Sequence, residues 1–318
     1  MRMKVSIVGA GKRKNGIGEY ITKYFHENGA DVSGVLGRTE ETSNQASSIL
    51  RKYGIEAYPY TDFNQMADRE KPDAVVIASP ASSHYDYLVK CIHSGLNIFC
   101  EKPFIWGGAE DMEGQAEAIL EKAREKRLIV AMNSQLPFLI RSYETICGKI
   151  EVERTNHFVI NLCPAVSGRE MIPESAPHAL SLLHHVFGPG KIQRLSFEPA
   201  EERKMTIRFE YLFDQSECDV SINLTTQEKQ PRDLSFGFNG RIVTRSLDLK
   251  DYAIYFNYED LRVRVCDPLE QSVKNFMDAV EKKIDPLIGY SHILNNMRLL
   301  KQINDGYGEF EKRHAWRN

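Results

Sequence analysis

The stretch KVSIVGAGKRKNGIGEYITKYF, residues 4–25, decides the fold of the first part of the chain. It begins as a short apolar strand, passes through a glycine-rich turn, and ends in a segment whose apolar residues recur at helical spacing. Glycines between a strand and a helix let the backbone approach a pyrophosphate, which binds at the helix N-terminus. We therefore predict that Gly9, Gly11, Gly16 and Gly18 bind a dinucleotide, in a loop longer than GxGxxG; the alternative is a glycine turn without a ligand.

Strands and helices alternate through the first 130 residues. The predicted strands are apolar on both faces, which is typical of a parallel sheet covered by helices on both sides. They span residues 4–8, 32–36, 57–60, 74–78, 97–100 and 128–132. The fold class predicted for residues 1–130 is therefore α/β, a Rossmann dinucleotide-binding domain with a doubly wound parallel sheet.

The pattern changes after about residue 150, where eight segments have the composition of strands. Several alternate between apolar and polar residues, as in residues 206–213, and this is typical of an antiparallel sheet. A helix is expected over residues 175–187, and helical spacing returns from residue 273. Residues 131–318 are predicted to form an α/β domain for substrate binding and oligomerisation. It has a large, mainly antiparallel open sheet, and its C-terminal helices can pack back on the first domain.

Composition excludes several functional classes. The 318 residues include 41 basic and 44 acidic ones, without a basic stripe, so we expect no nucleic-acid partner. The longest apolar runs are far shorter than the roughly 20 residues that cross a bilayer, so we expect no membrane partner. The N-terminal residues lack the pattern of a signal peptide, and no two of the six cysteines have zinc-like spacing. We therefore predict reduced thiols and a cytoplasmic location.

Gly37-Arg38-Thr39 follows the second predicted strand, where the adenosine ribose of a dinucleotide is expected. NAD-binding domains usually place an acidic residue there for the ribose hydroxyls. Arg38 instead suits a 2′-phosphate, and Thr39 can add a hydroxyl donor. We predict that these two residues favour NADP over NAD; the alternative is that Arg38 is an ordinary surface arginine.

Two further motifs are more specific: ASPASSH at residues 78–84 and CEKP at residues 100–103. Together with the glycine loop, they resemble the glucose–fructose oxidoreductase/inositol dehydrogenase family, called Gfo/Idh/MocA, over nearly the whole chain. The resemblance implies a Rossmann domain followed by an open-sheet domain, a nicotinamide cofactor, and hydride transfer at a carbon bearing a hydroxyl or carbonyl group. It also implies cofactor contacts from Ser79, Pro80, His84, Glu101 and Lys102.

The resemblance assigns catalytic roles to three residues. Lys102 matches the family's lysine, whose charge can polarise a substrate oxygen or relay its proton. The family's second signature, an aspartate four residues before a histidine, matches Glu174 and His178. His178 would take the substrate hydroxyl proton while Glu174 orients the imidazole. The chain departs from the family pattern at Glu174 itself, at Ala176 in place of a glycine, and at Ser181 in place of a further aspartate.

Neighbouring residues complete the predicted site. Asn133, Gln135, Ser181 and His185 are expected to bind substrate. Glu174, His178 and His185 would also share a helix face and could hold zinc, but Pro177 is expected to interrupt that helix, and the resemblance implies no metal. We predict none.

The predicted function is an NAD(P)-dependent oxidoreductase that transfers hydride to or from a sugar, polyol or related small molecule. The altered second signature leaves open an alternative from another class, a catalytically inactive NAD(P)-binding sensor or regulator of the same fold. A third possibility is a reductase of a non-sugar carbonyl or pigment. We also expect a homodimer or homotetramer, because outward positions such as those in YAIYF, residues 252–256, carry aromatic and aliphatic side chains.

Overall fold

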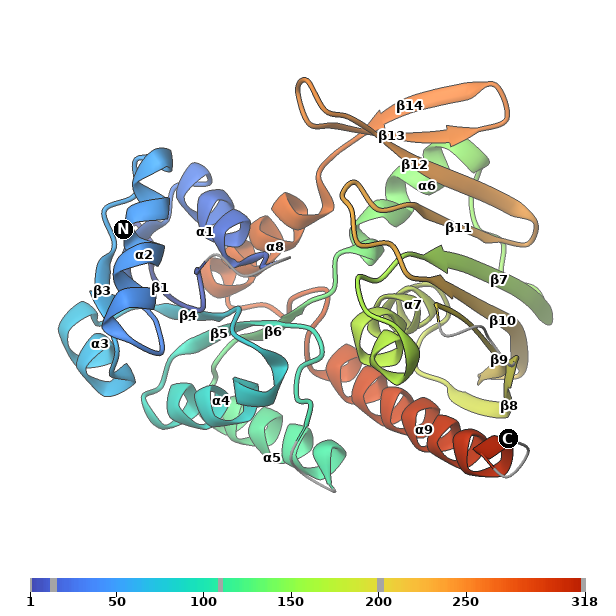
Figure 1. The fold of residues 1–318 in the computed structure, drawn as a ribbon, viewed down its shortest axis with the longest axis horizontal. Coiled ribbons are helices and arrows are strands. Elements are labelled where there is room, and N and C mark those ends of the chain that lie inside the picture. The colour runs from blue at the N-terminus through green and yellow to red at the C-terminus, as the bar shows by residue number, and fades with distance from the viewer. Residues whose placement is uncertain (1, 12–15, 108–110, 199–202, 316–318) are drawn as a thin grey trace. The chain divides into compact units, whose positions relative to one another are not determined.

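A computed structural model describes residues 2–11, 16–107, 111–198 and 203–315 of the chain. The chain divides into two compact units, each formed by two stretches of sequence (Figure 1). Unit 1 comprises residues 1–133 and 269–294, and unit 2 comprises residues 134–268 and 295–318. Among the helices that the structure describes, none is both long and apolar enough to span a membrane.

Unit 1 is built on a six-stranded parallel sheet with the strand order β3-β2-β1-β4-β5-β6. The strands are β1 (Lys4–Val8), β2 (Asp31–Leu36), β3 (Tyr58–Tyr60), β4 (Ala74–Ile77), β5 (Asn97–Glu101) and β6 (Val130–Asn133). The strand order reverses between β1 and β4, and open α/β sheets bind ligands at the carboxyl ends of their strands beside such a reversal. The predicted Rossmann fold is confirmed.

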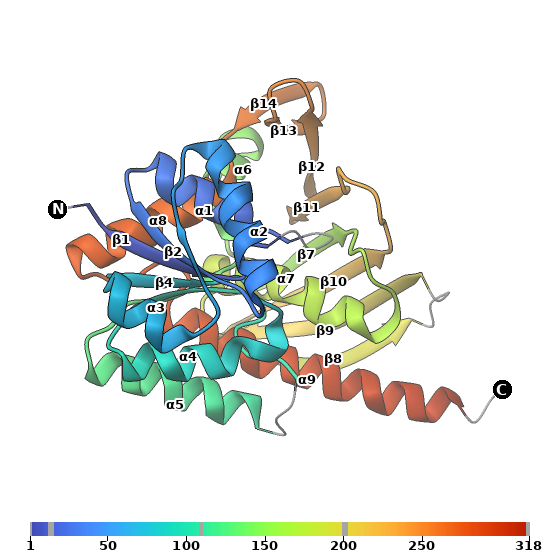
Figure 2. The same cartoon turned by 60° about the vertical axis from the view of Figure 1, so that its left-hand side comes forward.

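Helices cover both faces of this sheet (Figures 1 and 2). One face carries α1 (Gly18–Glu27), α2 (Glu40–Leu50) and α8 (Pro268–Lys282). The other carries α3 (Phe63–Glu70), α4 (His84–His93) and α5 (Met112–Glu125). The aromatic rings of Phe25, Phe99 and Phe276 meet edge to face or tilted, with centroids 5.3–6.0 Å apart, in the core under α1 and α8. This packing attaches α8 to unit 1, although more than a hundred residues separate it from β6.

Local sequence signals explain several helix ends. Thr39 caps α2, since its Oγ1 accepts from the backbone N–H of Thr42 at 3.2 Å. Gly54, at φ +75°, ends the short 3₁₀ turn after α2. Helix α3 was not predicted from the sequence, because eight residues with two buried apolar side chains give too short a periodic signal. The 3₁₀ turns are η1 (Arg51–Tyr53), η2 (Ala81–Ser83), η3 (Leu136–Leu139) and η4 (Gly168–Glu170).

Unit 2 is built on an eight-stranded sheet with the order β14-β13-β12-β11-β7-β10-β9-β8. Its strands are β7 (Thr155–Leu162), β8 (Lys191–Glu198), β9 (Lys204–Phe213), β10 (Ser216–Thr225), β11 (Leu234–Phe238), β12 (Arg241–Asp248), β13 (Ala253–Tyr258) and β14 (Leu261–Val265). Every pair is antiparallel except β7 with β10. The predicted large, mainly antiparallel sheet is therefore confirmed.

Three helices accompany this sheet: α6 (Ile140–Cys147), α7 (Met171–Phe187) and α9 (Tyr290–Ala315). The prediction that Pro177 interrupts the helix is wrong, since α7 continues through it. A proline removes one hydrogen bond within the helix, but thirteen of the seventeen residues of α7 are buried, and tertiary packing of this kind dominates helix stability. α9 lies along β8, where Gln302 Nε2 donates to the carbonyl of Ile192 at 3.1 Å.

The sheet face away from α7 is polar. Side chains of Thr206, Asn223, Asn161 and Ser235, from four neighbouring strands, form a hydrogen-bonded row with distances of 2.7–3.1 Å. The expectation that the aromatic and aliphatic side chains of residues 252–256 point outward is largely wrong. Ala253, Ile254 and Phe256 are buried, and Tyr252 is 74% exposed. The expected alternation of buried and exposed side chains does not hold here, because Tyr252 has a positive φ and β13 begins only after it. The first two residues of the strand, Ala253 and Ile254, are both buried.

Candidate cofactor-binding edge and catalytic residues

The glycine turn after β1 lies against the end of β4. A Cβ atom on Gly9 would lie 2.6 Å from the backbone nitrogen of Ser79, and Gly9 has φ +93°. Gly18 opens α1, and a Cβ there would lie 2.6 Å from the carbonyl oxygen of Gly9. Gly9 and Gly18 therefore make the tight turn and the close helix packing that a dinucleotide-binding turn needs. A Cβ on Gly11 would meet no heavy atom within 4 Å, Gly16 is exposed, and residues 12–15 of the loop lie outside the described residues.

The start of α1 fits a phosphate group. Its N-cap is Ile17, which has no side-chain acceptor for the first amides of the helix. The positive end of the helix dipole and these N–H groups attract an anion. A nicotinamide dinucleotide would place its pyrophosphate here, next to Gly9 and Gly18.

The end of β2 carries the residues expected at the adenosine ribose. Arg38 is exposed and follows β2 directly after Gly37. Thr39 uses a lone pair of its hydroxyl to cap α2. A Cβ on Gly37 would overlap the backbone nitrogen of Ser43, so this position accepts no larger residue without a shift of α2. Arg38 is therefore the exposed positive charge at the end of β2, and its contact with a ribose phosphate stays a prediction.

His84 joins the ends of β4 and β5. Its buried ring has Nε2 2.9 Å from the carbonyl oxygen of Ser79 and Nδ1 2.9 Å from that of Pro103. Burial lowers the pKa of His84, and the positive charge of Lys102 acts in the same direction, whereas the carbonyl contacts oppose it. Pro80, which precedes η2, is exposed beside this junction.

Glu101 and Lys102 follow β5 at the same edge. Asn133, at the end of β6, donates its amide to the Glu101 carboxylate and is itself fully buried. Lys102 is partly exposed, and the peptide bond to Pro103 is cis. Asn133 is thus a partner of Glu101, and its predicted contact with substrate stays a prediction. The carboxyl ends of β1, β4, β5 and β6 are thus linked by direct contacts.

The predicted catalytic pair of unit 2 lies on α7. Glu174 and His178 are four residues apart on this helix, and both are partly exposed. Ser181 is buried, and its hydroxyl accepts from Asn296 Nδ2 of α9 at 3.0 Å, so it ties α7 to α9 instead of facing solvent. Gln135 is partly exposed before η3. Lys102 belongs to unit 1 and His178 to unit 2, so their meeting at one substrate stays a prediction.

Two further histidines follow on α7. Burial lowers the pKa of His184 to about 4, and the neighbouring His185 acts in the same direction. Burial also lowers the pKa of His185, against the opposing charge of Glu144. In the part of the chain that the structure describes, no group of three or more His, Cys, Asp or Glu side chains is placed to hold a metal ion.

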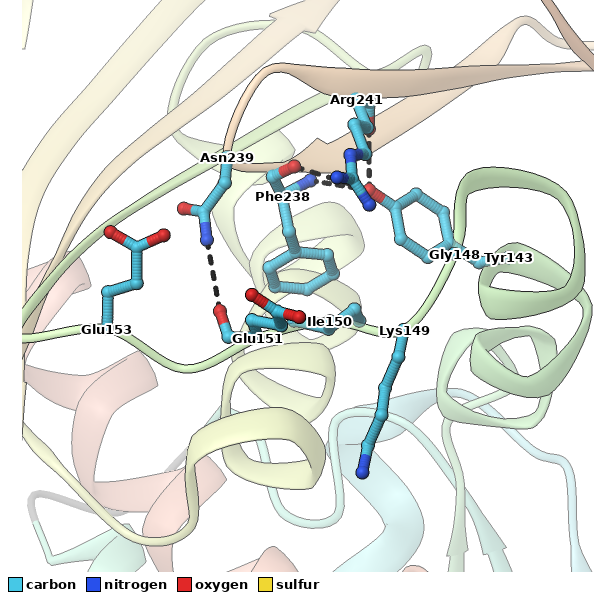
Figure 3. Close-up of a pocket in the computed structure, with 9 residues that line it drawn as sticks. All are labelled: Tyr143, Gly148, Lys149, Ile150, Glu151, Glu153, Phe238, Asn239 and Arg241. Carbon is cyan, nitrogen blue, oxygen red and sulfur yellow. Dashed lines mark hydrogen bonds between the residues drawn. The ribbon is translucent and has the colours of Figure 1, made fainter.

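A cavity of about 140 Å³ in unit 2 contains none of the predicted site residues (Figure 3). It is lined by Tyr143, Gly148, Lys149, Ile150, Glu151, Glu153, Phe238, Asn239 and Arg241. Several of its polar groups make structural hydrogen bonds. The Tyr143 hydroxyl donates to the carbonyl of Arg241 at 2.6 Å (Figure 3). Arg241 Nη1 donates to the carbonyl of Cys147 at 2.7 Å. These bonds attach α6 to the β11–β12 hairpin.

Comparison with known proteins agrees with this geometry. Residues 3–134 match a family model described as "Oxidoreductase family, NAD-binding Rossmann fold". The matching model is that of the Gfo/Idh/MocA family, and it covers less than half of the chain. The resemblance expected from the glycine loop and the ASPASSH and CEKP motifs is confirmed, and the matched residues contain all three.

Named relatives are about a quarter identical to this chain over the residues that align. Inositol 2-dehydrogenase of Salmonella typhimurium is 26% identical over 192 residues, which are 58% of this chain and 54% of that enzyme. The 4-carboxy-2-hydroxymuconate-6-semialdehyde dehydrogenase of a Sphingobium species is 26% identical over 128 residues, 40% of this chain and 36% of that enzyme. The chain thus matches about half, or less, of the length of these curated relatives.

Solved structures extend the likeness of fold to both units. A dehydrogenase from Chromobacterium violaceum superposes with a TM-score of 0.72 at 15% identity, covering 99% of each chain. UDP-N-acetylglucosamine 3-dehydrogenase from Acidithiobacillus ferrooxidans gives a TM-score of 0.69 at 15% identity, with 96% of this chain and 97% of that chain covered. At this identity the likeness concerns the Gfo/Idh/MocA fold alone.

Proposed function

We propose that the protein is an NAD(P)-dependent oxidoreductase that transfers hydride to or from a hydroxyl- or carbonyl-bearing carbon of a sugar, polyol or related small molecule. The observation that supports this most is the chain of contacts from Gly9 through Ser79 and His84 to Pro103. It joins a dinucleotide-binding turn to the segment that carries Lys102. The names of the relatives, inositol 2-dehydrogenase among them, support the same class of reaction.

The bound nicotinamide supplies or accepts the hydride, and the protein supplies binding and proton transfer. Lys102 stabilises negative charge on the reacting oxygen. His178 takes the hydroxyl proton during oxidation and returns it during reduction, and Glu174 orients the ring. Asn133 holds the Glu101 carboxylate and so fixes the backbone that precedes Lys102.

The finer features are part of the same proposal. NADP is the preferred cofactor, because Arg38 follows β2 and the neighbouring residues, Gly37 and Thr39, are not acidic. The chain acts in the cytoplasm as a homodimer or homotetramer through the open face of the unit 2 sheet. Light scattering at micromolar concentration tests the oligomer, and a monomer would contradict it. A catalytically inactive sensor of the same fold is the second candidate, which Glu174, Ala176 and Ser181 in the second signature leave open.

A substrate screen tests the function. Hydride transfer is followed by the absorbance of the reduced cofactor, with NAD and with NADP, across aldoses, polyols and sugar acids. Turnover of at least one compound, lost in Lys102→Ala, is the expected result. Tight cofactor binding without hydride transfer across the whole panel would favour the sensor.

A further inference from the structure

An arginine of unit 2 lies beside the predicted catalytic carboxylate. Arg232 lies between β10 and β11, and its Nη1 is 4.0 Å from Oε1 of Glu174 on α7. The side chain of Arg232 is 14% exposed and that of Glu174 is 40% exposed. Because Glu174 precedes His178 by one helical turn, the guanidinium lies next to the face that carries both predicted catalytic residues.

One edge of this guanidinium lacks a protein acceptor. The Nε and Nη2 atoms of Arg232 are buried, and neither has a hydrogen-bond partner among the residues that the structure describes. Their two N–H groups lie on the same side of the planar group and point in parallel, at the spacing of the two oxygens of a carboxylate. A buried donor without an acceptor is costly, and the cost is larger for a charged donor. An acceptor from outside the chain would remove it.

Other ionisable groups near Arg232 are Arg245 and Cys163. Arg245, on β12, donates to the backbone carbonyl of Arg232. Burial lowers the pKa of Arg245, and the charges of Asp233 and Asp267 oppose this shift. The thiol of Cys163 is also near, and burial raises its pKa, so it stays neutral. Arg232 faces Glu174 through Nη1, and its Nε–Nη2 edge is directed elsewhere.

We propose that the Nε–Nη2 edge of Arg232 binds the carboxylate of an acidic substrate, a sugar acid or a polyhydroxy acid, and so directs its hydroxyl-bearing carbon toward His178. The proposal rests on the proposed function, whose substrate class it narrows. A planar carboxylate matches two parallel N–H groups and adds one negative charge beside Glu174. A phosphate dianion would add two negative charges there and would be repelled more strongly by the Glu174 carboxylate.

Matched acidic and neutral substrates test the proposal. Gluconate is compared with sorbitol, and glucuronate with glucose, in the wild type, Arg232→Gln and Arg264→Gln, the last an exposed arginine of β14. In the wild type, kcat/KM is expected to be at least ~10-fold higher for the acids. Arg232→Gln should lower it by ~10–100-fold for the acids, mainly through KM, and by a clearly smaller factor for the neutral partners, because the variant also changes the charge beside Glu174. Arg264→Gln should change neither.

Other outcomes would overturn the proposal. If Arg232→Gln lowers turnover of acids and neutral sugars alike, Arg232 acts through Glu174 and not on a substrate carboxylate. If the wild type prefers sorbitol and glucose, the proposed function survives and the acidic substrate class does not. A preference for glucose 6-phosphate over gluconate would overturn the carboxylate assignment.

A binding measurement separates this proposal from the proposed function. Calorimetry of the cofactor-saturated protein with gluconate is expected to show binding that Arg232→Gln abolishes. Such binding without hydride transfer to any compound would support the carboxylate site and overturn the dehydrogenase. If Arg232→Gln fails to fold, Arg232→Lys keeps the charge but loses the parallel pair of donors, and the same selective loss for acids is expected.

Discussion

Nε2 of His84 lies 2.9 Å from the carbonyl oxygen of Ser79, so the first residue of α4 holds the end of β4. The other ring nitrogen faces a second carbonyl, that of Pro103, at the same distance. A neutral imidazole has one N–H and can donate to one of the two, whereas the protonated ring can donate to both. In either state the ring fills the space between the loop that approaches Gly9 and the loop that carries Lys102.

Replacing His84 should therefore weaken cofactor binding. His84→Ala removes one or two hydrogen bonds and a buried ring, so the two loops lose their common support. We expect the dissociation constant for the preferred cofactor to rise ~10-fold or more, as measured by calorimetry. His93→Ala, an exposed histidine at the other end of α4, should leave it unchanged. Equal affinity in wild type and His84→Ala would show that the bridge does not support the cofactor site.

Gly9 and Gly29 share a backbone conformation but differ in their surroundings, so the same substitution should affect them differently. Both have positive φ, +93° and +92°, but a Cβ would meet Ser79 at Gly9 and no heavy atom within 4 Å at Gly29. Gly29→Ala should cost about 1 kcal/mol of unfolding free energy from backbone strain alone. Gly9→Ala should cost more and should also abolish cofactor binding. Urea denaturation and cofactor titration measure the two effects, and similar losses in both variants would contradict the close approach to Ser79.

Periodicity predicted most of the fold because strong patterns are local. Six strands of unit 1 and eight of unit 2 were expected near their observed positions, since each is a short apolar or alternating run. Two short helices, α3 and α6, were not expected, because eight residues carry too few apolar positions. Pairing partners are not local, and this explains why the parallel contact of β7 with β10 in an otherwise antiparallel sheet was not foreseen.

The candidate site was less predictable than the fold. The glycines, Lys102 and the pair on α7 stand in motifs, so sequence alone identified them. Asn133 was assigned to substrate because it follows the sixth predicted strand, and no sequence signal pairs it with Glu101, 32 residues earlier. Arg232 was missed for the same reason, since it stands 58 residues from Glu174 in a segment without a motif. In the sequence, Arg232 is only an isolated arginine that precedes the apolar strand β11.

Lys102 and Glu174 should differ in how strongly they affect turnover. Lys102→Ala removes a positive charge at the reacting oxygen and should lower kcat by ~10²-fold or more, with cofactor binding largely intact. Glu174→Gln should be milder, because the carboxylate orients the imidazole and transfers no proton. Steady-state kinetics with the best substrate measures both, with Lys122→Ala, an exposed lysine on α5, as the control. Equal losses of kcat in the two variants would mean that Glu174 shares the proton relay. A near-normal kcat in Lys102→Ala would mean that Lys102 is not a catalytic residue.

Stability should depend on pH through His184. The side chain is buried, and burial lowers its pKa from about 6.5 to about 4, so the folded state keeps the ring neutral. In the unfolded chain the ring takes up a proton below pH 6.5, and this proton uptake favours the unfolded state. The stability that depends on a neutral His184 is therefore fully present above pH 6.5 and is lost as the pH falls towards 4. Between pH 7 and 5 the wild type should lose about 2 kcal/mol more unfolding free energy than His184→Leu. Urea denaturation at both pH values measures this, and His93→Asn, which is exposed, should behave as the wild type. Equal pH dependence in wild type and His184→Leu would contradict the lowered pKa.

Cofactor preference should depend on Arg38. This exposed side chain follows β2, and the residues on either side of it, Gly37 and Thr39, offer no carboxylate to the ribose diol of NAD. A charge-assisted hydrogen bond to a 2′-phosphate is worth about 1.5–3 kcal/mol, so the wild type should bind NADP ~10–100-fold more tightly than NAD. Arg38→Ala should remove most of this preference and leave NAD affinity unchanged, whereas Arg51→Ala, an exposed arginine after α2, should alter neither.

An acidic residue introduced at Gly37 is a poor test, because its Cβ would overlap the backbone nitrogen of Ser43 and disturb α2. The ratio of the two dissociation constants decides the matter. If wild-type protein binds NAD as tightly as NADP, Arg38 does not bind a 2′-phosphate and instead stacks on adenine or faces solvent.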